Sequence, residues 1–222
     1  MMKTRVYIDG FNLYYGCLKH TPYRWLDVHK MCRFLFPNDE TIKIKYFSAP
    51  IKARANDIDH DGPNRQQIYW RALRTIPDLE IIEGVFLKHK VPMKLAKGEG
   101  YALVIKNEEK GTDVNIATHL VNDAHNKSFE KAVVISNDSD LVATIRVVTN
   151  EINLSVTVIS PFKRNNIQLK SVATDVKQIR NGLLKVSQFN EKITDGVGEF
   201  CIPEKWKGIN EQSGLDKEKW GL

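Results

Sequence analysis

Apolar residues along this chain fall into two alternating patterns, short continuous runs and segments in which they recur every three or four positions. The continuous runs predict strands over residues 4–9, 41–49, 79–90, 132–136, 154–160 and 175–179. The helically spaced segments predict helices after Gly10, over 26–36, 62–76, 111–125, 139–149 and 166–171, and from about residue 180. Strands that alternate with helices favour a mainly parallel α/β sheet with helices on both faces.

One strand pattern departs from this alternation. The run at 79–90 continues past Gly84, and the next apolar segment, 101–107, follows without a helix between them. These two segments predict a β-hairpin that projects beyond the sheet, with the turn formed around "KGEG" at 97–100. Beyond about residue 190 the chain becomes polar. We therefore predict one folded domain over residues 1–188 and a polar C-terminal extension over 189–222.

Composition narrows the class of protein. With 222 residues, 27% charged and 42% hydrophobic, the chain is typical of a soluble globular protein with one full core. A formal net charge of +6 permits a polyanionic partner. The three cysteines are widely spaced and form no CxxC pair, which argues against a zinc site or a disulfide framework. No apolar run is long enough for a membrane span, and the N-terminus does not have the pattern of a signal peptide. We expect a cytoplasmic protein.

Four carboxylates are expected at one edge of the sheet. Asp9 ends the first predicted strand, Asp138 and Asp140 follow the strand at 132–136, and Asp113 opens the helix that precedes that strand. Ligands bind at the carboxyl ends of the strands in such sheets, and Asn12 can point to the same place. A structural interpretation stays open for each of them, because Asp is common in turns, at helix N-caps and in first helical turns. In that interpretation Asp113 stands behind a Thr112 cap.

Convergence of these carboxylates favours a cation site. Two carboxylates about 4 Å apart repel by about 4 kcal/mol at an effective dielectric constant near 20, so three or four of them in one crevice require a cation. Oxygen ligands without His or Cys select Mg²⁺ or Mn²⁺ over zinc. Such an ion activates water and stabilises charge on a phosphate. The pattern therefore predicts phosphoryl chemistry.

Four stretches, in this order, carry a family resemblance: "YIDGFNLYYG", "YFSAPIK", "KGTDVNIATHLVNDA" and "VVISNDSDLVATI". They resemble the NYN domain family, the LabA-like branch of the PIN-like nuclease fold, over roughly residues 3 to 185. The resemblance implies a Rossmannoid parallel sheet and a metal-dependent ribonuclease-type site. By position, it implies a metal site of Asp9, Asp113, Asp138 and Asp140, and a catalytic set that adds Asn12 and Ser136. Asn137 departs from the family, which usually has Gly there, but Asn tolerates left-handed geometry.

We therefore predict a metal-dependent endonuclease that hydrolyses RNA, with DNA left open as a substrate and a homo-oligomer as a possible assembly. One alternative is a non-catalytic regulatory protein that binds nucleic acid on the same scaffold. The other is a different phosphoryl-transfer enzyme. A Toprim-type site would place Glu where Asp9 stands, and a haloacid-type phosphatase would place Asp where Phe11 stands, so both fit less well.

Basic residues predict where a polyanion lies. Those of the predicted hairpin and its surroundings are Lys88, Lys90, Lys94, Lys106 and Lys110, and Arg54 and Arg65 flank a polar loop. An ordinary solvated surface remains the alternative. Four aromatic residues, Tyr14, Tyr15, Tyr69 and Trp70, could stack on bases, although their helical spacing favours core packing for most of them. Asp123, near the end of the helix at 111–125, is expected to be exposed.

Overall fold

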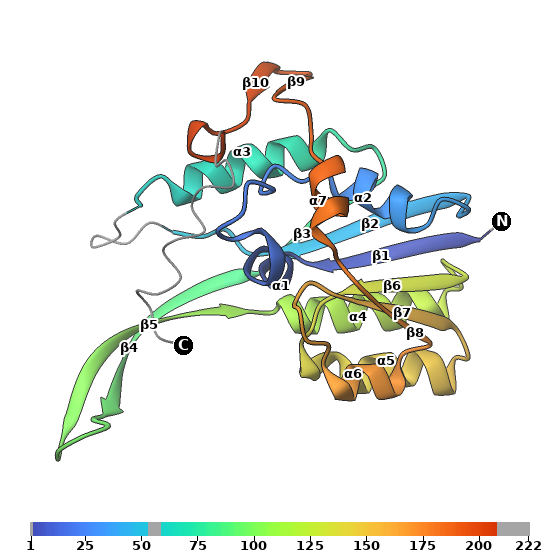
Figure 1. The fold of residues 1–222 in the computed structure, drawn as a ribbon. Coiled ribbons are helices and arrows are strands. Elements are labelled where there is room, and N and C mark those ends of the chain that lie inside the picture. The colour runs from blue at the N-terminus through green and yellow to red at the C-terminus, as the bar shows by residue number, and fades with distance from the viewer. Residues whose placement is uncertain (1, 53–58, 208–222) are drawn as a thin grey trace.

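A six-stranded parallel sheet organises the molecule. The computed structural model describes residues 2–52 and 59–207, and its strand order is β3-β2-β1-β6-β7-β8 (Figure 1). The strands are β1 (Lys3–Asp9), β2 (Thr41–Ser48), β3 (Leu79–Glu83), β6 (Lys131–Ile135), β7 (Ser155–Ser160) and β8 (Asp175–Gln178). Each neighbouring pair is parallel. The predicted parallel α/β architecture is therefore confirmed.

Helices cover both faces of the sheet. One face carries α1 (Gly10–Leu13) with the π-helical turn Tyr14–Leu18, α2 (Val28–Leu35), α3 (Gly62–Arg74) and α7 (Asn181–Val186). The other face carries α4 (Thr112–His125), α5 (Val142–Arg146), continued by the π-helical turn Val147–Glu151, and α6 (Ile167–Val172). Strands buried on both sides explain the continuous apolar runs in the sequence. Within the described ranges, no helix is long and apolar enough to cross a membrane.

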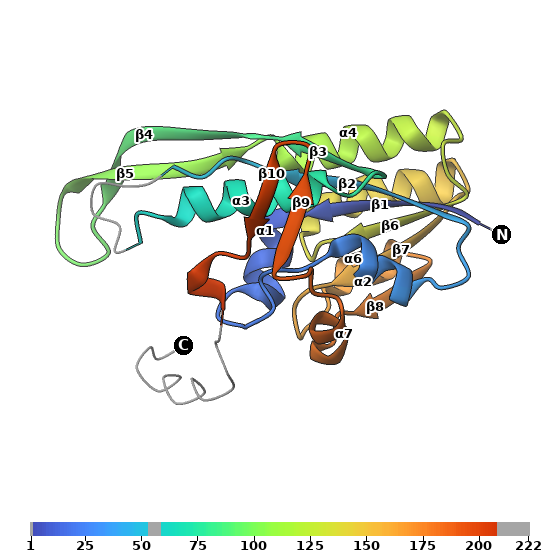
Figure 2. The same cartoon turned by 90° about the horizontal axis from the view of Figure 1, so that it is seen from above.

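A two-stranded ribbon projects from the end of the sheet opposite the start of β1, as Figure 2 shows. It consists of β4 (Val85–Lys94) and β5 (Tyr101–Lys110), paired antiparallel from Val85↔Lys110 to Lys94↔Tyr101. The single strand expected at 79–90 is thus two strands, and the projecting hairpin is confirmed. Because the two strands of the ribbon are antiparallel, the chain returns to the edge of the sheet from which the ribbon begins. For this reason α4 begins at the carboxyl edge of the sheet.

The chain after α7 packs back onto the core. Strands β9 (Lys192–Asp195) and β10 (Gly198–Cys201) form a small antiparallel hairpin, and a 3₁₀ turn spans Glu204–Trp206. Trp206 is buried, with its ring centroid 6.3 Å from that of Trp25 and 6.1 Å from that of Tyr69. Alternating apolar residues inside a polar stretch thus cover part of the core. The division of the chain at residue 188 stays a prediction.

Asp123 is buried, and the expectation that it is exposed was wrong. Its carboxylate accepts a hydrogen bond from the Tyr7 hydroxyl at 2.7 Å and forms ion pairs with Arg5 at 2.9 Å and Lys45 at 2.7 Å. These partners come from β1 and β2. The end of α4 packs over these strands, so a position that sequence spacing assigned to solvent faces the sheet instead.

Candidate active site

The central strands β1 and β6 end side by side, and the chain continues from them toward opposite sides of the sheet. Strand β2 lies beyond β1, whereas β7 lies beyond β6. This is the topological switch point of an open α/β sheet, where the connections diverge and leave a crevice at the carboxyl ends. Asp9 is the last residue of β1, and Ser136 directly follows β6. The topology therefore brings the first and last sequence motifs together.

Asp9 is held in place by its neighbours and is almost fully buried, with 3% of its surface exposed. Its carboxylate caps α1 by accepting hydrogen bonds from the backbone N–H of Asn12 at 2.9 Å and from Asn12 Nδ2 at 2.7 Å. Ser136 Oγ donates to Asp9 Oδ2 at 3.2 Å. Burial nevertheless raises the pKa of Asp9, and the charge of Asp138 raises it further. The carboxylate is thus held in one orientation, shielded from solvent and close to a second negative charge.

Asn12 and Ser136 also join the first motif to the last. Asn12 Oδ1 accepts a hydrogen bond from the backbone N–H of Asn137 at 3.1 Å. Ser136 Oγ accepts one from the backbone N–H of Asp138 at 3.1 Å. Both residues therefore position Asp9 relative to Asp138, which is the arrangement that a shared ligand would require.

Asn137 has a structural role that the sequence reasoning missed. Its Oδ1 accepts hydrogen bonds from Ser160 Oγ at 3.2 Å and from the backbone N–H of Asn166 at 2.8 Å. It therefore ties the turn after β6 to the end of β7 and the start of α6. Its φ angle is not positive, so left-handed geometry is not the reason for Asn at this position.

Asp138 and Asp140 lie in the turn after Asn137. Asp138 caps the 3₁₀ turn Ser139–Leu141, because its Oδ1 accepts a hydrogen bond from the backbone N–H of Asp140 at 3.0 Å. The helix expected over 139–149 is this turn followed by α5 and a π-helical turn. The structural interpretation of Asp138 as a cap is therefore correct. This capping bond uses only one of the two carboxylate oxygens of Asp138.

Asp113 completes the group from α4, on the same face of the sheet as α5. It stands in the first turn of α4, which begins after Gly111 at φ 96°, in the left-handed region that suits glycine. The expected Thr112 cap is wrong, because Thr112 is the first helical residue and Gly111 occupies the N-cap. Burial, together with the charges of Asp138, Asp9 and Asp140, raises the pKa of Asp113 to about 6. The other three carboxylates therefore lie within electrostatic reach of Asp113.

The donor set fits a divalent cation in its chemistry, although the side chains are not closed around a centre. Within residues 2–52 and 59–207, no group of three His, Cys, Asp or Glu side chains is arranged to hold a metal ion. The charges that raise the pKa of Asp113 are all carboxylates. An anionic cluster of this kind, made of hard oxygen donors, is suited to Mg²⁺ or Mn²⁺.

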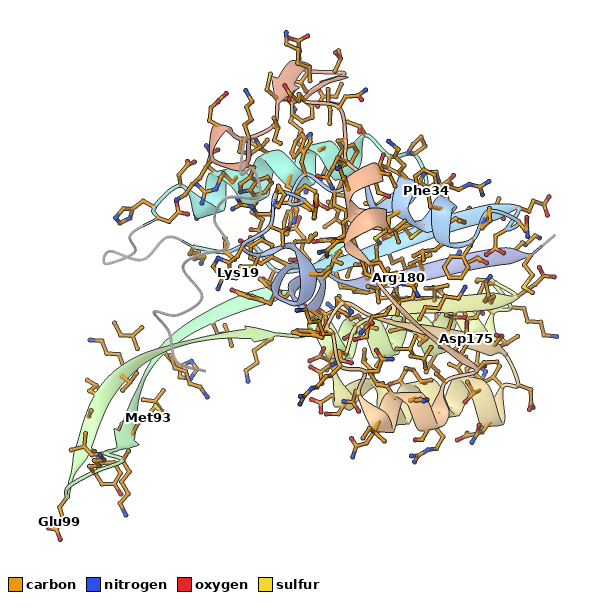
Figure 3. The ribbon with its side chains drawn as sticks, in the orientation of Figure 1. Lys19, Phe34, Met93, Glu99, Asp175 and Arg180 are labelled. Carbon is orange, nitrogen blue, oxygen red and sulfur yellow. The ribbon has the colours of Figure 1, made fainter. Side chains whose placement is uncertain are left out.

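The predicted nucleic-acid contacts do not share one location. Lys90, Lys94, Lys106 and Lys110 are exposed on the ribbon, whose far end is marked by Met93 and Glu99 in Figure 3. Lys88 belongs to the ribbon, but its side chain lies outside what the structure describes, and Arg54 lies outside the described residues. Arg65 is buried and forms ion pairs with Asp59 and Asp61.

The ribbon is also apolar. Leu87, Leu103 and Ile105 have 48%, 68% and 56% of their surfaces exposed, and Tyr101 has 72%. Sequence reasoning emphasised the lysines and missed this mixed character, although the apolar residues beside the lysines of β4 and the apolar run that opens β5 would have indicated it. Stacking and charge neutralisation are both available on such a surface.

Comparisons with known proteins agree with this architecture. The sequence model of the NYN domain matches residues 3–179. A curated relative from Pseudomonas putida (strain DSM 28022 / S16), named 6-hydroxy-3-succinoylpyridine 3-monooxygenase HspA, is 30% identical and is matched over 95% of this chain and 77% of its own length. A solved structure of a protein of unknown function, VPA0982 from Vibrio parahaemolyticus RIMD 2210633, is similar with a TM-score of 0.52 at 18% identity. That match covers 81% of this chain and 94% of the other.

Proposed function

This chain belongs to the NYN domain family, a family of PIN-like nucleases, and on that basis we propose that it is a metal-dependent endonuclease that hydrolyses RNA at the carboxylate cluster. The observation that carries the proposal is the state of Asp113, whose pKa is raised to about 6 by burial and by three neighbouring carboxylates. Carboxylates gathered at a switch point repel one another, and a bound cation would relieve that repulsion.

In this proposal Asp9, Asp113, Asp138 and Asp140 hold Mg²⁺ or Mn²⁺. The bound ion would supply an activated water and stabilise charge on the phosphate. Asn12 and Ser136 act by positioning, because their hydrogen bonds to Asp9 fix the direction of its carboxylate. The backbone N–H of Asp140 does the same for Asp138. The residues are thus preorganised at the end of β1, in α1, in the turn after β6 and on α4.

The ribbon would contact the nucleic-acid backbone. Lys90 and Lys94 are exposed on β4, which leaves the sheet at the same edge as the carboxylates. A negatively charged cluster would repel RNA by itself, so cations on the ribbon that extends from the same edge of the sheet would assist binding of the phosphate backbone.

The name of the curated relative describes a monooxygenase acting on a pyridine derivative. We propose hydrolysis because carboxylates gather at the switch point, and the charges that raise the pKa of Asp113 are all carboxylates with no cation among them. That set is typical of phosphoryl transfer with a hard divalent ion.

The test is cleavage of end-labelled single- and double-stranded RNA and DNA with Mn²⁺, with Mg²⁺ or with a chelator. We expect ion-dependent internal cleavage of RNA that is lost in Asp113→Asn. The matched control is Asp175→Asn, because Asp175 is an exposed carboxylate at the start of β8, away from α1 in Figure 3. Binding of RNA without cleavage under every condition would instead identify the regulatory, non-catalytic alternative.

A further inference from the structure

A cavity lies beside the carboxylate cluster, between α1 with its π-helical turn and α3. Its volume is about 260 Å³. Seven aromatic side chains contribute to its wall: Phe11, Tyr14, Tyr15, Tyr46, Tyr69, Trp70 and Trp206. Tyr46, Tyr69 and Trp206 are buried and form the inner part, whereas Tyr15 has 56% of its surface exposed and stands at the mouth. A hollow of this size with flat apolar walls suits one planar ring system.

The mouth of the cavity has the geometry of a stacking platform. The rings of Phe11 and Tyr15 are stacked, with centroids 6.4 Å apart and planes 20° from parallel. Lys19 Nζ lies 4.8 Å from the centroid of the Tyr15 ring, and Figure 3 shows Lys19 beside α1, on the side from which the ribbon departs. An aromatic platform with an ammonium group next to it is suited to a base and its phosphate.

The inside of the cavity contains an unused donor. Arg65 lines it with 7% of its surface exposed. Its terminal nitrogens are paired with Asp59 and Asp61, but its Nε has no hydrogen-bond partner among the described residues. A buried donor without a partner costs free energy unless a ligand or water supplies an acceptor. Arg24, over the Trp206 ring at 5.7 Å, adds another positive charge to the same wall.

The cavity adjoins the carboxylate cluster through α1. Gly10 and Phe11, which directly follow Asp9, both line it. A Cβ atom at Gly10 would lie 2.7 Å from the Tyr46 hydroxyl and 2.8 Å from the Phe47 carbonyl oxygen, so α1 is packed tightly against β2. A ring in the cavity and a phosphate at Asp9 would therefore be separated by little more than this one turn of helix.

We propose that the cavity binds one nucleobase of the RNA, next to the phosphodiester at the carboxylate cluster. The inference rests on the proposed function, because it assigns part of the same substrate. The base stacks with Phe11 and Tyr15 and accepts a hydrogen bond from Arg65 Nε. Lys19 neutralises the adjoining phosphate. Base preference of the enzyme would then be decided in this cavity, on the side of the sheet opposite α4.

The experiment follows the ¹⁵N-labelled tryptophan indole signals of the full chain during titration with AMP, GMP, CMP, UMP and a short oligoribonucleotide, with chelator present to prevent cleavage. Trp70 and Trp206 line the cavity, so their signals report on its occupation. We expect saturable shifts of both signals with at least one mononucleotide and with the oligonucleotide. Removing the phosphate should weaken binding to the wild type but not to Lys19→Ala.

Two variants make the test specific. Tyr15→Ala should weaken nucleotide binding about tenfold, because it removes a stacking surface. Phe34→Ala is the matched control: Phe34 is exposed to 54% on α2, nearly the same as Tyr15, and lies away from α1 in Figure 3. Since both positions are exposed, neither change is expected to prevent folding.

Several results would overturn the inference. The inference is wrong if neither the nucleotides nor the oligonucleotide shift the indole signals, or if the shifts persist unchanged in Tyr15→Ala. It is also wrong if mononucleotides shift the signals but the oligonucleotide does not, or if a simple aromatic carboxylate such as benzoate binds more tightly than the nucleotides. RNA cleavage without any response of Trp70 and Trp206 would overturn the base site and retain the nuclease. Binding that depends on Tyr15 in a protein that cleaves no RNA would retain the base site and contradict the nuclease.

Discussion

Replacing Asp113 by Asn is expected to stabilise the protein in the absence of metal while abolishing cleavage. In the folded chain the pKa of Asp113 is raised from 3.8 to about 6 by burial and by three carboxylates. At about 1.4 kcal/mol per pKa unit, this corresponds to a penalty of about 3 kcal/mol for the ionised group. Asp113 is only half-buried, so solvent screening reduces the expected gain to about 1 kcal/mol. An uncharged amide of the same shape escapes this penalty.

The pH dependence has a defined sign. Because the folded-state pKa lies above the unfolded value, the folded chain holds this proton more tightly, and stability falls as the pH rises. The penalty is absent below about pH 4, grows between about pH 4 and 6, and is constant above that range. The advantage of Asp113→Asn over wild type should therefore be small at pH 4.5 and complete at pH 7.5.

The assay is thermal unfolding with chelator at both pH values, repeated with Mn²⁺. About 1 kcal/mol corresponds to about 2–4 °C in Tm for a chain of this size. Mn²⁺ should raise the Tm of wild type and do so less for Asp113→Asn, since binding to the folded state alone stabilises it. Asp175→Asn serves as the control and should follow wild type. The reasoning is refuted if Asp113→Asn melts at or below the wild-type Tm at pH 7.5 with chelator and cleaves RNA at the wild-type rate.

Three further predictions concern other parts of the molecule. Asp138→Asn retains an oxygen that can accept the capping hydrogen bond, so the Tm without metal should equal that of wild type while the cleavage rate falls by orders of magnitude. An unchanged cleavage rate would show that Asp138 serves only as a cap. Replacing Lys90 and Lys94 together by Ala removes two cations, so it should weaken RNA binding for all sequences and reduce the slope of log affinity against log salt by about 1.4–1.8. An unchanged slope would identify a merely solvated surface. Asp123→Asn leaves two cations facing a neutral group and should lower the free energy of unfolding by about 3 kcal/mol in denaturant titration, without changing the metal dependence of cleavage; unaltered stability would show that the ion pairs contribute little.

The sequence was informative about the site for a physical reason. In a parallel sheet the carboxyl ends of all strands lie at one edge, so strand boundaries alone place Asp9, Ser136 and Asp138 together. The return of the chain from a hairpin adds Asp113 to that edge. By contrast, the hydrogen bonds that Asn137 makes to Ser160 and Asn166 join segments more than twenty residues apart. No local sequence pattern predicts these hydrogen bonds.

Errors occurred where local propensity competes with packing. Thr112 is a reasonable N-cap by composition, but Gly111 takes that position because the chain enters α4 from the ribbon with a positive φ. Asp123 reads as a solvent-facing residue near a helix end, yet the sheet below offers Arg5, Lys45 and the Tyr7 hydroxyl as partners. A buried charge is stable only with such partners, and these come from strands that are distant in sequence.

The sequence by itself determined the alternation of strands and helices, the parallel sheet and the set of carboxylates at its edge, because periodicity and strand order are local properties with few topological outcomes. Only the tertiary structure decided which face of each helix is buried and which carboxylates raise the pKa of Asp113. It alone also assembled the cavity, since Phe11, Arg65 and Trp206 come from three separate regions of the chain. Burial and long-range contacts are properties of the packed molecule, so they cannot be inferred from any single segment of the chain.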